Sequence, residues 1–312
     1  MSSFIQRFNL VARWRGMGYR AKREQIAGYL FISPWLLGFI FLIAGPVIMS
    51  LFVSFTRWNI VSDPHWVGLR NYHRIFTADR NFVQALKVTF RYAIFYLPLT
   101  TVLALSAALA LNAKVKGAGI FRSFYYMPYM APQVAATLVW MWMLNPRYGL
   151  INIMLGWVGI HGPNWLSDPR SALFGLMFIG LWGVGGSAII YLAGLQNIPQ
   201  HLYDAAEVDG ANTWQQFRHV TLPMLSPTIF YVLVIELIGV FQTFTTSFVA
   251  TGGGPMKSTL FYMLYIYNKA WVSLRMGYAS ALAWILTVII LVFTLLILKS
   301  SALWVHYEAE KK

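Results

Sequence analysis

Long stretches without a charged residue decide what this chain can fold into. There are five such blocks, and a sixth contains a single charged residue, Glu236. A helix needs about 20 apolar residues to cross a lipid bilayer, and each block can hold one such helix. Only 11% of the residues are charged, against roughly a quarter in soluble domains. We therefore predict an all-α integral membrane protein with six transmembrane helices. The blocks are residues 25–56, 92–113, 123–146, 171–203, 220–256 and 276–298.

The first block follows a basic segment, which is also the order found in signal peptides. A signal-peptide core spans about 7–15 apolar residues. Residues 25–56, in contrast, carry no charge throughout, and no small-residue cleavage site closes the block. We therefore expect a retained first span, and six spans place both termini on the same side of the membrane.

Lys and Arg near the span ends indicate which side that is, because cytoplasmic loops carry an excess of them. With the N-terminus inside, 13 of the 24 Lys and Arg residues lie on cytoplasmic segments. The short loop with Lys114, Lys116 and Arg122 weighs most, although residues 57–91 hold six basic residues on the other side. The charges favour cytoplasmic termini by a small margin.

Composition excludes several other classes of function. The basic residues behind the net charge of +14 lie between the apolar blocks, so membrane lipid headgroups account for them better than nucleic acid does. No Cys is present, and the six His show no metal-ligand spacing. We predict no metal site, no catalytic residue and no enzyme activity in this chain.

The glycine-rich segment 252–259 (GGGPMKST) shares residue types with phosphate-binding loops. That motif needs Gly immediately before Lys, and Met256 occupies this position. We therefore expect no site for ATP or Mg²⁺ in the chain, so that energy must come from another subunit. The aromatic stretch that follows, residues 261–271, is typical of an interfacial helix.

The connections between the blocks divide the chain into parts. Residues 1–27 are expected to form a basic cytoplasmic tail, and residues 28–86 the first span with an external cap. Residues 87–299 form a five-helix core that includes a cytoplasmic loop at 196–223, and residues 300–312 form a second cytoplasmic tail.

The cytoplasmic loop concentrates negative charge. Asp204, Glu207 and Asp209 are three of the ten acidic residues and lie within six positions. Ala205 and Ala206 give a flat face that another protein can approach closely, and Asp204 could pair with a cation on that protein. Composition alone favours an ordinary solvated connector over a docking face.

The same loop carries signals for two short helices. Residues 198–208 predict the first, which Gly210 ends. Asn212 or Thr213 can cap a second over residues 214–220. We expect two short helices, bent at the glycine and held at the membrane surface.

The spacing of this loop resembles the coupling-loop signature of ABC-importer permeases, which is Glu-Ala-Ala-x3-Gly-x9-Ile-x-Leu-Pro. Asp replaces Glu here and Val replaces Ile. The resemblance implies a type I ABC importer permease fold and a loop that docks on an ATPase subunit. It also implies a second homologous permease subunit, two ATPase subunits that bind ATP and Mg²⁺, and an extracytoplasmic solute-binding protein. The matching residues are Asp204, Ala205, Ala206, Gly210, Val220, Leu222 and Pro223.

Further segments are similar to the carbohydrate branch of that family, which includes maltose, lactose, multiple-sugar and glycerol-3-phosphate permeases. The resemblance spans about residues 28–300 and matches the larger-loop subunit of the usual pair. It implies import of a sugar or polyol across a bacterial or archaeal plasma membrane. The segments are residues 33–35, 67–72, 252–255 and 276–279.

Glu236 is the leading candidate for contact with the solute. It lies near the middle of its predicted span, where a carboxylate costs at least about 2.5 kcal/mol. We expect it to face the bundle interior or a wet cavity; pairing with another helix, or a protonated state, would also satisfy it. Val240 and Thr243 share its helix face, and Gln242 lies beside it.

Trp182, Gly183 and Gly186 share one face of the span before the loop. A Trp together with polar groups suits a sugar, although the two glycines could instead permit close helix packing. The resemblance to maltose-type permeases implies sugar contacts at these three positions and at Glu236, Val240 and Thr243, with side chains unlike that relative's mainly amide set. A proton-coupled carrier that uses Glu236 is an alternative, but paired interrupted helices are not evident. A membrane-embedded enzyme lacks a catalytic constellation.

Overall fold

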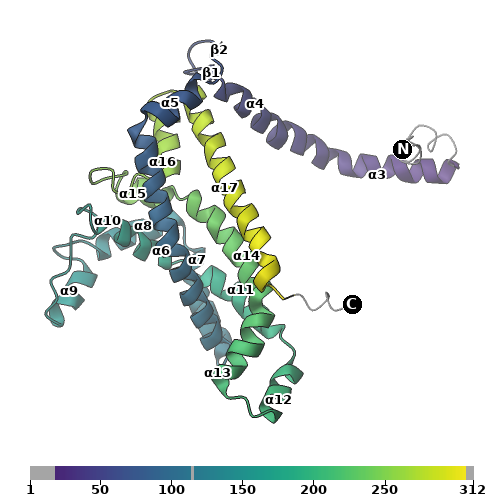
Figure 1. Ribbon diagram of the computed structural model, residues 1–312, viewed down its shortest axis with the longest axis vertical. Helices are drawn as coiled ribbons and strands as arrows, with labels where there is room; N and C mark the ends of the chain where they lie inside the picture. The colour runs from purple at the N-terminus through teal and green to yellow at the C-terminus, as the bar shows by residue number, and fades with distance from the viewer. Residues whose placement is uncertain (1–17, 114–115, 307–312) are drawn as a thin grey trace.

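The computed structural model describes residues 18–113 and 116–306, and nearly all of its regular structure is helical (Figure 1). Within this part of the chain, four helices are long and apolar enough to cross a membrane, and a bent helix pair makes a fifth candidate. The all-α membrane fold is thereby confirmed, whereas six spans stay a prediction. Residues 1–17, 114–115 and 307–312, which include much of the two predicted tails, lie outside the described residues.

The first apolar block forms an arm that points away from the rest of the molecule (Figure 1). Few of its residues are buried, and only the end of α4 packs on α17. A π-helical turn precedes Pro46, which has no N–H to donate to the helix. The arm consists of α3 (Tyr19–Gly38), η1 (Phe39–Ala44) and α4 (Gly45–Ser54).

A small cap follows the arm. Strand β1 (Thr56–Arg57) pairs antiparallel with β2 (His65–Trp66), and helix α5 (Arg70–Ala78) comes next. The Asn71 side chain donates to the backbone carbonyls of Ser54 and Thr56 at 2.8 and 2.9 Å, which ties α5 to the end of the arm.

The core surrounds α6 (Arg80–Leu111), which packs against α11 (Gly185–Gln196) and α14 (Leu222–Phe241). Helix α14 in turn packs against α17 (Met276–Trp304). The buried side chains form two apolar clusters along α6. Each helix buries one face, which is expected for helices whose other faces meet lipid or a partner.

The aromatic stretch is not an interfacial helix, so that prediction is wrong. It forms α16 (Tyr262–Tyr267) and the π-helical turn η3 (Asn268–Val272). Tyr262 and Tyr265 are buried in the core, where Tyr262 packs edge-on against Phe82 of α6. Aromatic residues fill a protein core as well as a membrane interface, and composition does not separate the two.

Two apolar blocks are interrupted near their middle. The third block divides at Pro132 into α7 (Ala118–Met130) and α8 (Gln133–Met143), and the fourth bends by 48° between α10 (Ala172–Leu181) and α11. Both interruptions border the same space, as described below. The connecting elements are α9 (Leu150–Trp157) and α15 (Thr245–Ala250).

The loop at 196–223 contains α12 (Gln200–Val208), as expected. The second short helix does not stand alone, which corrects the prediction of a separate helix over residues 214–220. Helix α13 (Thr213–Gln216) runs through the π-helical turn η2 (Phe217–Thr221) directly into α14. The loop is therefore one helix and the extended foot of a span, joined at Gly210.

Candidate functional site

A polar cavity of about 570 Å³ lies between the helices, at the level of the two interruptions. Its walls come from the middle of α6, the α7–α8 break, the α10–α11 bend and the end of α14. Helix breaks suit such a place, because backbone freed from helical hydrogen bonds is tolerated where it lines a cavity.

Glu236 of α14 faces this cavity and is held from two other helices. Its Oε1 accepts a hydrogen bond of 2.5 Å from the Ser187 hydroxyl on α11, and its Oε2 accepts one of 2.8 Å from the Thr100 hydroxyl on α6. Among the lining residues in the described part of the chain, Glu236 is the one Asp, Glu, Lys, Arg or His. Two hydroxyls thus solvate the carboxylate, and the cavity offers it no cation.

The structure brings four of the other predicted residues to the same cavity. Trp182 and Gly183 line it at the α10–α11 bend, and Val240 and Thr243 line it one and two turns beyond Glu236. The Trp182 ring packs edge-on against Trp140, with 5.6 Å between ring centroids. Trp182 is nevertheless 45% exposed, which leaves part of its surface open.

Two predicted residues do not line the cavity. A Cβ on Gly186 would lie 2.6 Å from the ring of Tyr129, so Gly186 permits close packing, the alternative already open from the sequence. Gln242 is exposed at the end of α14. The sequence suggested a cavity contact because Gln242 follows the cavity residues of α14. Helix α14 ends at Phe241, however, so its helical period does not carry Gln242 to the cavity wall.

Several cavity residues were missed by the sequence reasoning. Ser187 lies four positions after Gly183, so the helical period would have placed both on one face. Thr100 offered no such signal, since it lies on a different span. Gln133 donates to the Thr246 hydroxyl at 3.2 Å, and Tyr129 lines the cavity between the two interruptions.

The coupling loop, defined here as residues 196–223, protrudes at the opposite end of the molecule from the cap (Figure 1). Gly210 has φ = +77°, a conformation that favours glycine. Asn212 caps α13 through a reciprocal capping box with Gln215. A hydrogen bond of 3.0 Å between the hydroxyls of Tyr203 and Thr221 joins α12 to the foot of α14.

The predicted loop residues are distributed over this unit. Asp204 and Ala205 are exposed on α12, and Asp204 accepts a hydrogen bond of 3.1 Å from Gln200. Ala206, Gly210 and Val220 line a shallow hollow of about 320 Å³, while Leu222 and Pro223 begin α14. Two apolar side chains missed by the sequence reasoning are prominent beside them. They are Val208, which is 88% exposed, and Trp214, which is 67% exposed.

Apolar helices around a polar cavity, with a protruding loop at one end, form the arrangement expected of a membrane permease. A family model described as "Binding-protein-dependent transport system inner membrane component" matches residues 100–302, and the chain belongs to this family. The resemblance to ABC-importer permeases is confirmed, as is the prediction of a transporter subunit rather than an enzyme.

Curated relatives match over nearly the whole chain. The probable ABC transporter permease protein YesP of Bacillus subtilis (strain 168) is 41% identical over 93% of this chain and 95% of that protein. The trehalose/maltose transport system permease protein MalF of Thermococcus litoralis is 36% identical over 89% and 94%. The arabinooligosaccharides transport system permease protein AraP of Bacillus subtilis (strain 168) is 35% identical over 92% and 91%.

A solved structure supports the fold. A chain in the crystal structure of a bacterial ABC transporter involved in the import of the acidic polysaccharide alginate aligns with a TM-score of 0.77. The identity is 24%, and the alignment covers 91% of this chain and 98% of that chain. At this identity the likeness concerns the fold alone.

Proposed function

We propose that this chain is one of two homologous permease subunits of an ATP-driven importer that carries a sugar or related polyol across the plasma membrane of a bacterium or archaeon. The observation that carries the proposal is the cavity, where Trp182 and Glu236 face one space inside an apolar bundle. Sugars have an apolar ring face that packs on aromatic groups and hydroxyls that donate to carboxylates. The names of two relatives, which specify trehalose/maltose and arabinooligosaccharides, support the same class of solute.

The hydrogen bonds of Glu236 leave room for a solute. A carboxylate offers about four acceptor sites, and Ser187 and Thr100 occupy one on each oxygen. The remaining sites can accept from solute hydroxyls, while the two protein hydroxyls fix the direction of the carboxylate. Val240 adds apolar surface and Thr243 a further hydroxyl at the same wall.

The coupling loop serves as the contact with the ATPase subunits in this proposal, so it and both termini face the cytoplasm. Two copies of the ATPase bind ATP and Mg²⁺; the described part of this chain has no group of three or more His, Cys, Asp or Glu that could hold a metal. Exposed Val208 and Trp214 provide apolar docking surface, and Asp204 provides a charge. The solute-binding protein docks at the other end of the molecule.

The mechanism is alternating access. Closure of the ATPases on ATP pushes the coupling loop, and the loop moves α14 because the two are continuous through η2. Helix α14 carries Glu236, so the motion reaches the cavity directly. The α7–α8 break and the α10–α11 bend act as hinges at the cavity wall.

The experiment is ATP hydrolysis by the assembled complex in nanodiscs, with and without the sugar-loaded binding protein. We expect the binding protein to stimulate hydrolysis, and Asp204→Arg to remove the stimulation while the complex still assembles. Glu24→Arg, a charge reversal on the first helix far from the coupling loop, is the matched control. Full stimulation in the Asp204→Arg complex would contradict the assigned role of the loop.

A further inference from the structure

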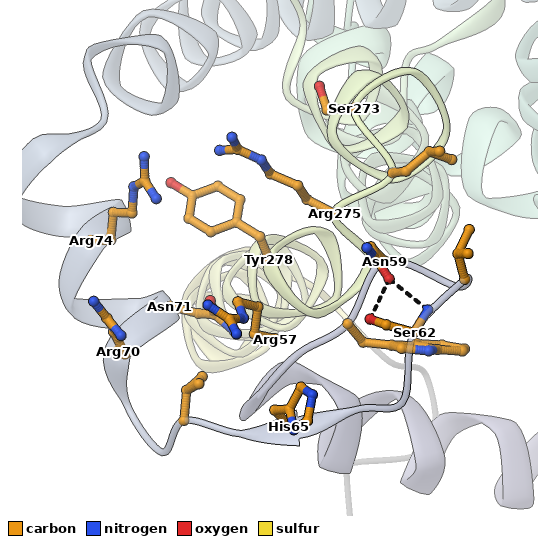
Figure 2. Close-up of a pocket in the computed structure, with 14 residues that line it drawn as sticks. Arg57, Asn59, Ser62, His65, Arg70, Asn71, Arg74, Ser273, Arg275 and Tyr278 are labelled. Atoms are coloured by element: carbon orange, nitrogen blue, oxygen red, sulfur yellow. Dashed lines mark hydrogen bonds between the residues drawn. The ribbon is translucent and has the colours of Figure 1, made fainter.

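A second polar hollow lies at the end of the molecule opposite the coupling loop, and arginines dominate it (Figure 2). It has a volume of about 710 Å³ and lies between the β1–β2 connection, α5 and the segment that leads into α17. Four of its lining residues are arginines, and we call the site the arginine pocket. They are Arg57, Arg70, Arg74 and Arg275.

The arginines surround the pocket from different parts of the chain. Arg57 belongs to β1, Arg70 and Arg74 to α5, and Arg275 precedes α17. In Figure 2, Arg74 and Arg275 lie on either side of the Tyr278 ring. Four like charges around one hollow repel one another, so the arrangement favours an anion that would lower this repulsion.

The described part of the chain supplies no such anion. No Asp or Glu lines the pocket, and no ion pair joins its arginines to a carboxylate of residues 18–113 or 116–306. Asp63 is exposed in the β1–β2 connection but does not line the pocket.

Asp79, at the start of α6, is already engaged. It accepts hydrogen bonds from the hydroxyls of Tyr265 and Tyr278 and from the backbone of Phe82. Burial raises the pKa of Asp79, but these bonds and the charge of Lys269 outweigh burial and hold the pKa below its usual value. Asp79 therefore stays ionised beside Tyr278, but its single charge is shared with Lys269 and does not balance four arginines.

Two sources of anions fit the pocket poorly. Anionic lipids attract basic segments that directly flank an apolar span, whereas these arginines line a hollow between the β1–β2 connection, α5 and the segment before α17. A transported anion would next meet Glu236, the carboxylate of the cavity, and be repelled. A soluble acidic protein that approaches the external face fits the charge of the pocket better than either source.

We propose that the arginine pocket receives acidic side chains of the extracytoplasmic solute-binding protein. This inference rests on the proposed function, since it requires a binding-protein-dependent importer with this end outside. Guanidinium groups suit the task, because they bind carboxylates through two parallel hydrogen bonds. The same role accounts for three of the six Lys and Arg residues that residues 57–91 hold against the usual preference for the cytoplasmic side, namely Arg57, Arg70 and Arg74.

The four arginines are exposed, so they act mainly on the rate of encounter. Exposed charges at the edge of an interface change the association rate and its salt dependence more than the lifetime of the complex. Salt at about 0.1 M screens charges beyond about 10 Å. The pocket therefore predicts fast, salt-sensitive docking.

The test measures association of the binding protein with the assembled complex at about 50 mM and about 300 mM NaCl. It uses nanodiscs of phosphatidylcholine alone and, in parallel, nanodiscs that also contain phosphatidylglycerol. The variant replaces Arg57, Arg70, Arg74 and Arg275 with Gln. We expect its association rate at low salt to fall on the order of tenfold and to lose most of its salt dependence. A second variant with Lys at the same four positions should keep the salt dependence. This variant therefore separates loss of charge from loss of folding.

Arg147→Gln with Arg170→Gln is the matched control, because both are exposed external arginines outside the pocket. This pair should leave the rate within about twofold of the unmodified complex. An unchanged rate in the fourfold Gln variant would overturn the inference. So would an effect confined to nanodiscs that contain phosphatidylglycerol, which would assign the pocket to lipid. Absence of docking by the unmodified complex would overturn the proposed function itself.

Discussion

The cavity and the coupling loop satisfy their polar groups in opposite ways. In the cavity, Glu236 depends on hydroxyls from two other helices, Ser187 and Thr100. In the loop, most hydrogen bonds join residues within five positions, such as the Asn212 capping box and the Ala211 N–H that donates to the Ala206 carbonyl at 2.9 Å.

This difference matches two mechanical roles. A cavity held together across helices changes when the helices move, so its affinity for a solute can differ between states. A loop stabilised by hydrogen bonds between residues close in sequence keeps its shape, so it can transmit a displacement from the ATPase to the spans. Substitutions in the cavity should therefore change solute affinity, whereas substitutions in the loop should change coupling to ATP at unchanged affinity.

The largest effect is expected for Glu236→Lys. A lysine near the middle of a membrane span costs about 2.5–3.5 kcal/mol, so uptake should fall on the order of 100-fold. Uptake of a labelled sugar into vesicles measures this. Glu236→Gln is the matched variant, because it keeps the size and one acceptor, and it should retain more uptake than Lys. Equal uptake by both variants would remove Glu236 from the solute path.

Gly210→Val should act on the loop alone. A Cβ at this position meets no atom within 4 Å, so the cost is the backbone conformation, about 1–2 kcal/mol. Coupled ATP hydrolysis should fall about 5–30-fold, with the solute concentration for half-maximal uptake unchanged. Gly210→Asn should lie in between, since Asn tolerates positive φ better than Val does. A changed solute affinity in Gly210→Val would break the division between the two regions.

Trp182→Ala tests the cavity from its aromatic side. Loss of the ring removes contacts worth about 0.5–1.5 kcal/mol, which corresponds to about a 2–10-fold higher half-saturation concentration for uptake. Basal ATP hydrolysis should not change. Exposed Trp214→Ala in the coupling loop provides the reverse control, with altered hydrolysis and unaltered half-saturation. Identical behaviour of the two Trp variants would show that the regions are not separable.

The smallest effect is expected for Asn212→Ala. Loss of an N-cap costs about 1 kcal/mol, so the amide of Gln215 should exchange with solvent about fivefold faster. The neighbouring substitution Thr213→Ala should leave that rate unchanged, because its hydroxyl makes no hydrogen bond among the described residues. No acceleration in Asn212→Ala would mean that the loop depends on tertiary contacts, as the cavity does.

What the sequence could predict follows the same division. Helix α12, the break at Gly210 and the cap at Asn212 are encoded within a few residues, and they lie where local signals place them. The apolar blocks could also be read from the sequence. So could the position of Glu236 at a cavity wall, because a lone carboxylate in an apolar block needs polar surroundings.

The remainder depends on contacts between distant segments. Thr100 is 136 positions from Glu236, and no local pattern links the two. The continuity of α13 with α14 was missed because a π-helical turn has no recognised sequence signature here. The burial of Tyr262 and Tyr265 was missed because an aromatic stretch suits a membrane interface and a protein core alike.

The central claim is tested most directly by uptake of a labelled neutral sugar into proteoliposomes that contain the assembled complex. We predict uptake only when ATP is present on the coupling-loop side and the loaded binding protein on the arginine-pocket side. Uptake by this chain alone, driven by a pH gradient without ATP or binding protein, would contradict the account and identify a proton-coupled carrier instead.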